Sequence, residues 1–140
     1  MIKLKPGKYV IGDPCYVVKD SLWLEYCELL DKSEAEKKQG LVVLRGVEMF
    51  ASSTAYGDGV YLDKATGEDF AVDAGLIGAT PLDQGIEEEG LDFVALANLG
   101  AVKYIGQEFG CIEIENGLIK IENYIIDTDP SNDYYYDDEY

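Results

Sequence analysis

Hydrophobic and polar residues alternate most regularly in the segment CIEIENGLIKIE, at residues 111–122. Asn116-Gly117 is typical of a two-residue hairpin loop, because both residue types tolerate the positive φ angles of a type I′ turn. A loop at this position predicts the opposed pairs Ile114 with Ile119, Ile112 with Ile121, and Glu113 with Lys120. The apolar pattern, the charge pairing and the turn agree, so this segment predicts a β-hairpin.

The segment TAYGDGVYLDKATGEDFAVDAGLIG, at residues 54–78, predicts a second hairpin. If residues 65–67 form a three-residue loop with Gly67 in the left-handed conformation, the opposed pairs are Lys64 with Glu68, Leu62 with Phe70, and Val60 with Val72. The other face of this hairpin would carry Tyr61, Asp63, Asp69, Ala71 and Asp73. Asp63 would then oppose Asp69, which is unfavourable unless water or a cation separates the two charges.

The rest of the pattern predicts one helix and further short strands. Apolar residues recur every three or four positions over residues 19–32, which indicates an amphipathic helix. Residues 2–13 suggest a strand pair or one bent strand broken at Pro6-Gly7, and residues 41–52 suggest two short strands or one strand bent at Gly46. Residues 91–100 fit a short helix or a buried strand. The expected fold is α+β: a mostly antiparallel, twisted sheet with one amphipathic helix packed on it.

Charge narrows the classes of partner. The chain of 140 residues carries 28 acidic and 11 basic side chains, a formal net charge of −17, and Arg45 is its only arginine. Binding to nucleic acid or to an anionic membrane depends on basic side chains, so neither is expected as a direct partner. A basic surface on another protein complements this charge better.

Targeting signals and cysteines bear on the compartment. The first residues lack the apolar core of a signal peptide, and no apolar run approaches the roughly 18 residues that span a bilayer. Cys15, Cys27 and Cys111 are odd in number and far apart, as expected for reduced thiols. We therefore expect a cytoplasmic protein.

Residue types limit the possible chemistry. The chain has no histidine, which removes histidine-based triads and the usual zinc sites. Carboxylates remain: if the motifs GDP, YGDG and VDAG converge, then Asp13, Asp58 and Asp73 could hold Mg²⁺ or Ca²⁺. The alternative is that these aspartates and the neighbouring glycines only build turns. We expect no cofactor and treat Cys15 as a small apolar residue near a turn.

The last residues differ in composition from the rest. We expect a single domain over residues 1–127, followed by an acidic tail over residues 128–140 that has little to bury. The tail is either a solvating end or a segment that docks on a basic surface, where carboxylates imitate phosphates and tyrosine rings stack like bases. Its candidate binding residues are Tyr134, Tyr135, Tyr136, Asp137 and Asp138.

Two motifs carry a resemblance to a known family. Gly12-Asp13-Pro14-Cys15-Tyr16 and Tyr56-Gly57-Asp58-Gly59, together with VDAG and the closing hairpin, resemble a family of small uncharacterised proteins of bacteriophages, prophages and some bacterial genomes. The resemblance spans most of residues 8–126. It implies an accessory phage-type protein in the bacterial cytoplasm and transfers no catalytic or binding residue.

Three functional hypotheses follow. The first is a non-enzymatic binding protein or inhibitor whose acidic surface occupies a basic, nucleic-acid-handling host or defence protein. The second is a protein that sequesters a nucleotide, with Tyr9, Tyr16, Tyr56 and Tyr61 available for stacking. The third is a metal-dependent hydrolase built on the three motif aspartates.

Overall fold

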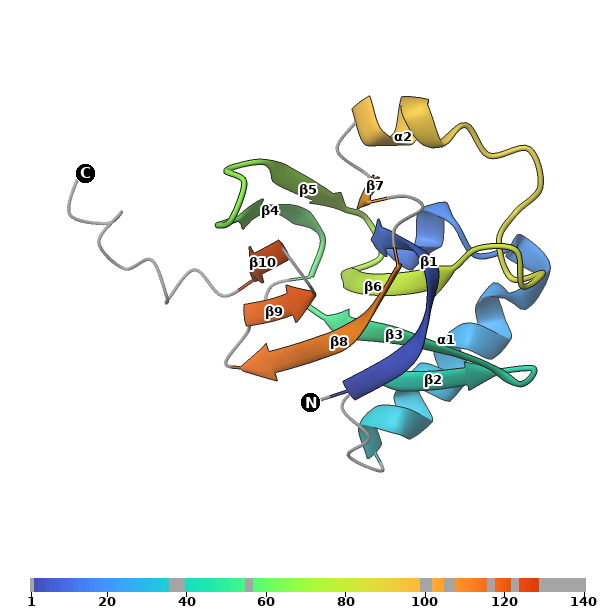
Figure 1. Cartoon of the computed structure of the whole chain (residues 1–140). Coiled ribbons are helices and arrows are strands. Elements are labelled where there is room, and N and C mark those ends of the chain that lie inside the picture. Colours follow the sequence, from blue (N-terminus) through green and yellow to red (C-terminus); the bar gives the residue numbers. More distant parts are fainter. Residues whose placement is uncertain are drawn as a thin grey trace.

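The computed structural model describes residues 2–35, 40–54, 57–98, 102–104, 108–115, 118–121 and 124–128. Its elements follow the order β1 (Ile2–Gly12), η1 (Pro14–Tyr16), α1 (Asp20–Ala35), β2 (Leu41–Leu44), β3 (Val47–Ser53), β4 (Gly59–Asp63), β5 (Asp69–Val72), β6 (Leu76–Pro81), α2 (Phe93–Asn98), β7 (Val102–Tyr104), β8 (Glu108–Glu115), β9 (Leu118–Ile121) and β10 (Tyr124–Asp127). Strands dominate, and α1 is the main helix (Figure 1). The α+β fold predicted from the sequence is confirmed.

β1 links the two wings of the sheet. The strands pair antiparallel in the order β2-β3-β6-β1-β8-β9-β10-β4-β5, and β7 also pairs with β1. β6 lies along one edge of β1, while β8 follows the beginning of its other edge and β7 its end. The register with β8 shifts between Lys3 and Gly7, around Pro6, which has no N–H to donate to a partner strand. Residues 2–12 thus form one bent strand.

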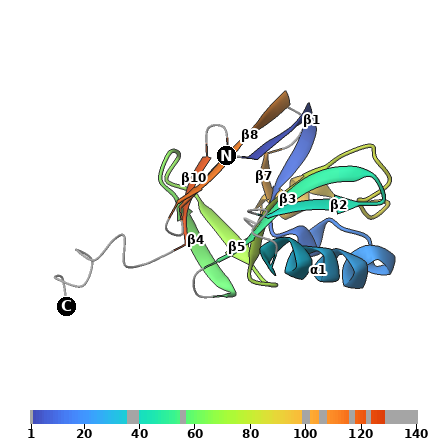
Figure 2. The ribbon, with the colours of Figure 1, turned by 90° about the horizontal axis from the view of Figure 1, so that it is seen from below.

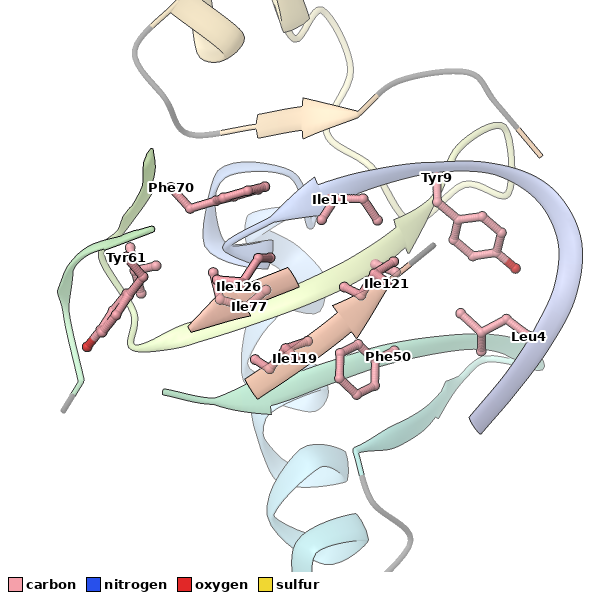
Figure 3. Close-up of a cluster of buried hydrophobic side chains, with 12 residues drawn as sticks. Leu4, Tyr9, Ile11, Phe50, Tyr61, Phe70, Ile77, Ile119, Ile121 and Ile126 are labelled. Atoms are coloured by element: carbon pink, nitrogen blue, oxygen red, sulfur yellow. The ribbon is translucent and has the colours of Figure 1, made fainter. Parts of the chain in front are cut away.

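The sheet curls so that both wings enclose a common core (Figure 3). β1, β3 and β6 contribute side chains from one wing, and β4, β5, β9 and β10 contribute them from the other. The core residues labelled in the figure are Leu4, Tyr9, Ile11, Phe50, Tyr61, Phe70, Ile77, Ile119, Ile121 and Ile126. All of them are at most 7% exposed, so the two wings share one continuous apolar interior.

Helix α1 covers the outer face of the β2–β3–β6 wing (Figure 2). Its buried residues Leu22, Tyr26 and Leu30 recur at a spacing of four and pack in one cluster with Val42 and Met49. Each residue of β6 is buried: Leu76 packs in the cluster with α1, η1 lies against the strand, and Ile77 and Ala79 belong to the core. The predicted amphipathic helix is confirmed, and it continues three residues beyond the expected end.

The hairpin between β8 and β9 matches the prediction. Its register sets Ile114 opposite Ile119, Ile112 opposite Ile121, and Glu113 opposite Lys120. The turn residues Asn116 and Gly117 lie outside the described residues. Residues 41–53 also form a hairpin of two strands, with Arg45 and Gly46 at φ 52° and 83° in the turn. Residues 93–98 are helical, which decides between the two alternatives left open for that segment.

The register of the hairpin between β4 and β5 is one residue away from the prediction. Tyr61 opposes Phe70 and Leu62 opposes Asp69, so the pairing of Asp63 with Asp69 predicted from the sequence is wrong. Because side chains alternate between faces, this shift turns Tyr61 and Asp63 into the interior. Val60, predicted on the apolar face, is instead 64% exposed.

Candidate functional site

Asp13 lies where β1 ends and η1 begins, and its carboxylate binds three backbone amides. Oδ1 accepts from the Cys15 N–H at 3.0 Å, and Oδ2 accepts from the N–H groups of Asp73 and Ala74 at 2.9 and 2.7 Å. Asp13 is fully buried, and Pro14 after it begins the short helix, where no N–H is needed. The motif GDP is therefore joined to the motif VDAG through one carboxylate.

The motif VDAG in turn contacts the motif YGDG. Gly75 has φ 78°, and a Cβ atom on it would lie 3.3 Å from the Cα atom of Gly57. The Gly75 carbonyl accepts from the Thr54 N–H at 2.9 Å, and the Gly57 carbonyl accepts from the Tyr61 hydroxyl at 2.8 Å. We call residues 12–16, 54, 57–58 and 72–75 the motif junction.

The three motifs converge, but their carboxylates do not. Asp58 and Asp73 are exposed, whereas Asp13 is buried and its two oxygens already accept backbone N–H groups. Within the described part of the chain, no three histidine, cysteine or acidic side chains are placed to hold a metal ion together. A carboxylate that accepts several backbone N–H groups stabilises the contact between two chain segments. The junction therefore supports the alternative that these aspartates and glycines build turns.

Cys15 lies in the junction and has the environment of a neutral thiol. Burial is the main cause that raises its pKa from 9.0 to about 12, and the charge of Asp13 and a hydrogen bond to it act in the same direction. An N–H from Ala74 opposes them with a smaller effect. Burial likewise raises the pKa of Tyr16, which is half-buried beside it. A thiol in this setting is a poor nucleophile.

Asp63 is a second buried carboxylate, which the sequence reasoning placed on the wrong face. Its Oδ1 accepts from the N–H groups of Ala65 and Ile125 at 3.1 and 2.8 Å, and its Oδ2 accepts from the Thr66 hydroxyl at 2.7 Å. The Asp63 N–H also donates to the Glu68 carbonyl at 2.8 Å, which closes a loop over residues 64–67. The sequence Asp-Lys-Ala-Thr-Gly was the available signal, because an aspartate before a turn often binds the amide two residues later.

Two of the tyrosines proposed for stacking, Tyr9 and Tyr61, have other roles in the structure. Tyr9 and Tyr61 are 4% and 7% exposed, and their hydroxyls donate to the carbonyls of Lys5 and Gly57. Their rings are part of the core (Figure 3). Tyr56 and the tail residues Tyr134, Tyr135, Tyr136, Asp137 and Asp138 lie outside the described residues.

Exposed carboxylates lie on α1 and on the loop of residues 82–92, which contacts the start of that helix, and a second set lies near β4 and β5. On α1, the exposed acids recur at a helical spacing on the side away from the core. We define the acidic face by the exposed residues Asp20, Glu28, Asp31, Asp83, Glu88, Glu89 and Asp92.

Backbone contacts hold the loop against the start of α1. Val18 forms a bridge with Glu87, the Lys19 N–H donates to the Ile86 carbonyl at 3.0 Å, and the Glu88 N–H donates to the Val17 carbonyl at 2.8 Å. The Glu88 carboxylate also accepts from the Asp20 N–H at 3.0 Å, at the first residue of α1. Ile86 is buried, so its side chain anchors the loop from within. The acids of the loop are thus presented from a fixed backbone.

Comparisons with protein-family models, with curated proteins and with solved structures find no match to this chain. Among the residues that the structure describes, no helix combines the length and the apolar character needed to cross a bilayer. The functional argument therefore starts from the geometry of the chain itself.

Proposed function

We propose that this chain is a non-enzymatic binding protein whose acidic face occupies a basic surface on another protein, one that normally handles nucleic acid. The proposal rests on a difference in environment between two groups of carboxylates. Asp13 and Asp63 are buried and bound to N–H groups, whereas the carboxylates of the acidic face are exposed on a fixed backbone. A surface of fixed carboxylates offers Arg and Lys side chains the acceptors that phosphates otherwise provide.

Electrostatics supports this choice of partner. With a formal charge of −17, the chain attracts basic surfaces and repels polyanions over a distance of about one Debye length, roughly 8–10 Å at physiological salt. The resemblance of GDPCY and YGDG to phage-type proteins suggests the setting, in which the partner is a host or defence protein of a bacterial cell. The role of such a protein would be inhibition by occupying the partner's nucleic-acid site.

Capture of a partner followed by competition tests this function. The tagged chain is incubated with bacterial lysate at low salt, retained proteins are eluted with increasing NaCl, and a purified retained protein is then assayed for nucleic-acid binding. We expect a basic protein that elutes as salt rises and that loses its nucleic acid when the chain is added in stoichiometric amount. Capture of no basic protein, or a captured protein that binds chain and nucleic acid together, would rule out this function.

A further inference from the structure

A cavity of about 190 Å³ lies between β1, the start of β3 and the segment that follows β6, away from the motif junction. Two lysines and one glutamate line it together with apolar side chains. The lining residues used below are Lys5, Lys8, Val47, Glu48, Pro81 and Leu82. The cavity could hold about six water molecules, given a share of roughly 30 Å³ each, and is smaller than the roughly 300–1,000 Å³ of sites for drug-sized ligands.

Basic residues outnumber acidic residues in the lining of this cavity, whereas acidic residues predominate in the chain as a whole. Lys5 and Lys8 are exposed, and neither ammonium forms an ion pair with another residue in the described ranges. Glu48 likewise has no ion pair there, although it lines the same cavity. Two lysines from β1 and one glutamate from β3 therefore line the same small cavity, and they form no ion pair with one another.

Tyr9 fixes the backbone that carries the two lysines. Its buried side chain reaches back along β1, and its hydroxyl donates to the Lys5 carbonyl at 2.7 Å (Figure 3). Burial and the nearby charge of Glu48 both raise the pKa of Tyr9, which places the Glu48 carboxylate in the same neighbourhood. The hydrogen bond from Tyr9 thus stabilises the part of β1 that lines the cavity.

We propose that this cavity binds a small zwitterion of the α-amino acid class. Lys5 and Lys8 would bind its carboxylate and Glu48 its ammonium group, while Val47, Pro81 and Leu82 would contact a short apolar side chain. Opposite charges on two elements match a ligand that carries both signs. A zwitterion has no net charge, so it can approach a chain of charge −17 without the long-range repulsion that a nucleotide or a phosphate meets.

An NMR titration of the full chain tests this site. L-Valine is the probe, and acetate, methylamine and inorganic phosphate are compared with it at matched ionic strength. We expect saturable amide shifts around residues 5–9, 46–48 and 81–84 with L-valine, and binding at least about tenfold weaker for acetate and methylamine, which each lack one of the two charges. Equal or tighter binding of phosphate or acetate, or no saturable shift with L-valine, would overturn the proposal.

Variants that remove one charge each test whether Lys8 and Glu48 bind the ligand. Lys8→Gln and Glu48→Gln are each expected to weaken L-valine binding about tenfold. Lys32→Gln, which removes an exposed lysine from α1, is the matched control and should leave binding unchanged. The amide spectrum of each variant shows whether it remains folded. Equal affinities for L-valine in the folded variants and in the original chain would also overturn the proposal.

Discussion

The motif junction and the acidic face both contain several carboxylates, yet the Asp13 carboxylate of the junction is buried and those of the face are exposed. At the junction, Asp13 is buried and accepts three N–H groups, two of which come from a segment sixty residues further along the chain. On the acidic face, residues such as Glu28 and Glu89 are exposed. The comparison teaches that the surroundings of an aspartate or glutamate, rather than its presence in a motif, decide whether its carboxylate is bound within the fold or left at the surface.

The largest effect that we expect is on the reactivity of the Cys15 thiol, which should differ between the folded junction and the unfolded chain. A pKa of about 12, compared with an ordinary 9.0, lowers the thiolate fraction at neutral pH by about 1,000-fold. A thiolate of higher pKa is also more nucleophilic, with a Brønsted slope of about 0.4–0.5, so we expect alkylation of Cys15 by iodoacetamide, followed by mass spectrometry at several pH values, to be slower by about 30- to 60-fold in the folded chain than in urea. Similar rates in the two states would contradict the structure of the junction.

The same shift has a consequence for stability at high pH. The folded chain keeps the Cys15 thiol protonated at pH values where the unfolded chain has lost that proton. The contribution of this thiol to the free energy of unfolding is therefore constant below about pH 9 and falls as the pH rises from 9 towards 12.

Removal of the Asp13 carboxylate is expected to have the largest effect on stability. Asp13→Ala leaves three N–H groups without their acceptor, which should lower the free energy of unfolding by about 3 kcal/mol. Asp73→Ala is the matched control, because it removes an exposed carboxylate and retains the backbone N–H that binds Asp13. Urea denaturation measures both. Equal small losses for the two variants would show that the junction does not depend on this carboxylate.

Two glycines separate the effect of backbone conformation from the effect of crowding. Gly75 in the junction has a φ angle of 78°, and Gly90 in the loop of residues 82–92 has a φ angle of 74°. Of these two glycines, only Gly75 has neighbouring atoms within 4 Å of an added Cβ. Gly90→Ala should cost about 1 kcal/mol for the left-handed conformation alone. Gly75→Ala should cost about 1 kcal/mol more, because the Cβ would press on Gly57. Thermal or urea unfolding would detect the difference, and identical costs would mean that the two motifs do not touch.

Sequence reasoning succeeded where the decisive interactions are local. The Asn116-Gly117 signal, together with the apolar pattern, predicted the register of β8 and β9, and the spacing of apolar residues predicted α1. The contact between GDP and VDAG was anticipated as a possibility, but its chemistry was not. The aspartates were considered as ligands, whereas Asp13 binds backbone amides.

The register of β4 and β5 was missed because a distant residue helps to determine it. Asp63 accepts from the Ile125 amide, 62 positions further along the chain, and Lys64 pairs with the buried Asp127 at 3.1 Å. Neither contact is visible in the local pattern of residues 59–72, where a three-residue loop gave an equally regular apolar face. The acidic face was likewise inaccessible in detail, since the contacts between residues 17–20 and 86–88 form only in the folded chain.

The most direct test of the account compares two sets of four charge-neutralising substitutions for binding to the captured basic partner. One variant changes the acidic face by Glu28→Gln, Asp31→Asn, Asp83→Asn and Glu89→Gln. The control changes exposed acids near β4 and β5 by Asp58→Asn, Glu68→Gln, Asp69→Asn and Asp73→Asn. Both variants lower the magnitude of the formal charge equally, from −17 to −13.

We expect the acidic-face variant to bind the partner at least about tenfold more weakly and with a smaller dependence on salt, while the control retains most of the affinity. Both should unfold within about 0.5 kcal/mol of the original chain, since the substitutions are on the surface. Wild-type affinity in the acidic-face variant, or an equal loss in both variants, would contradict the claim that this face recognises the partner.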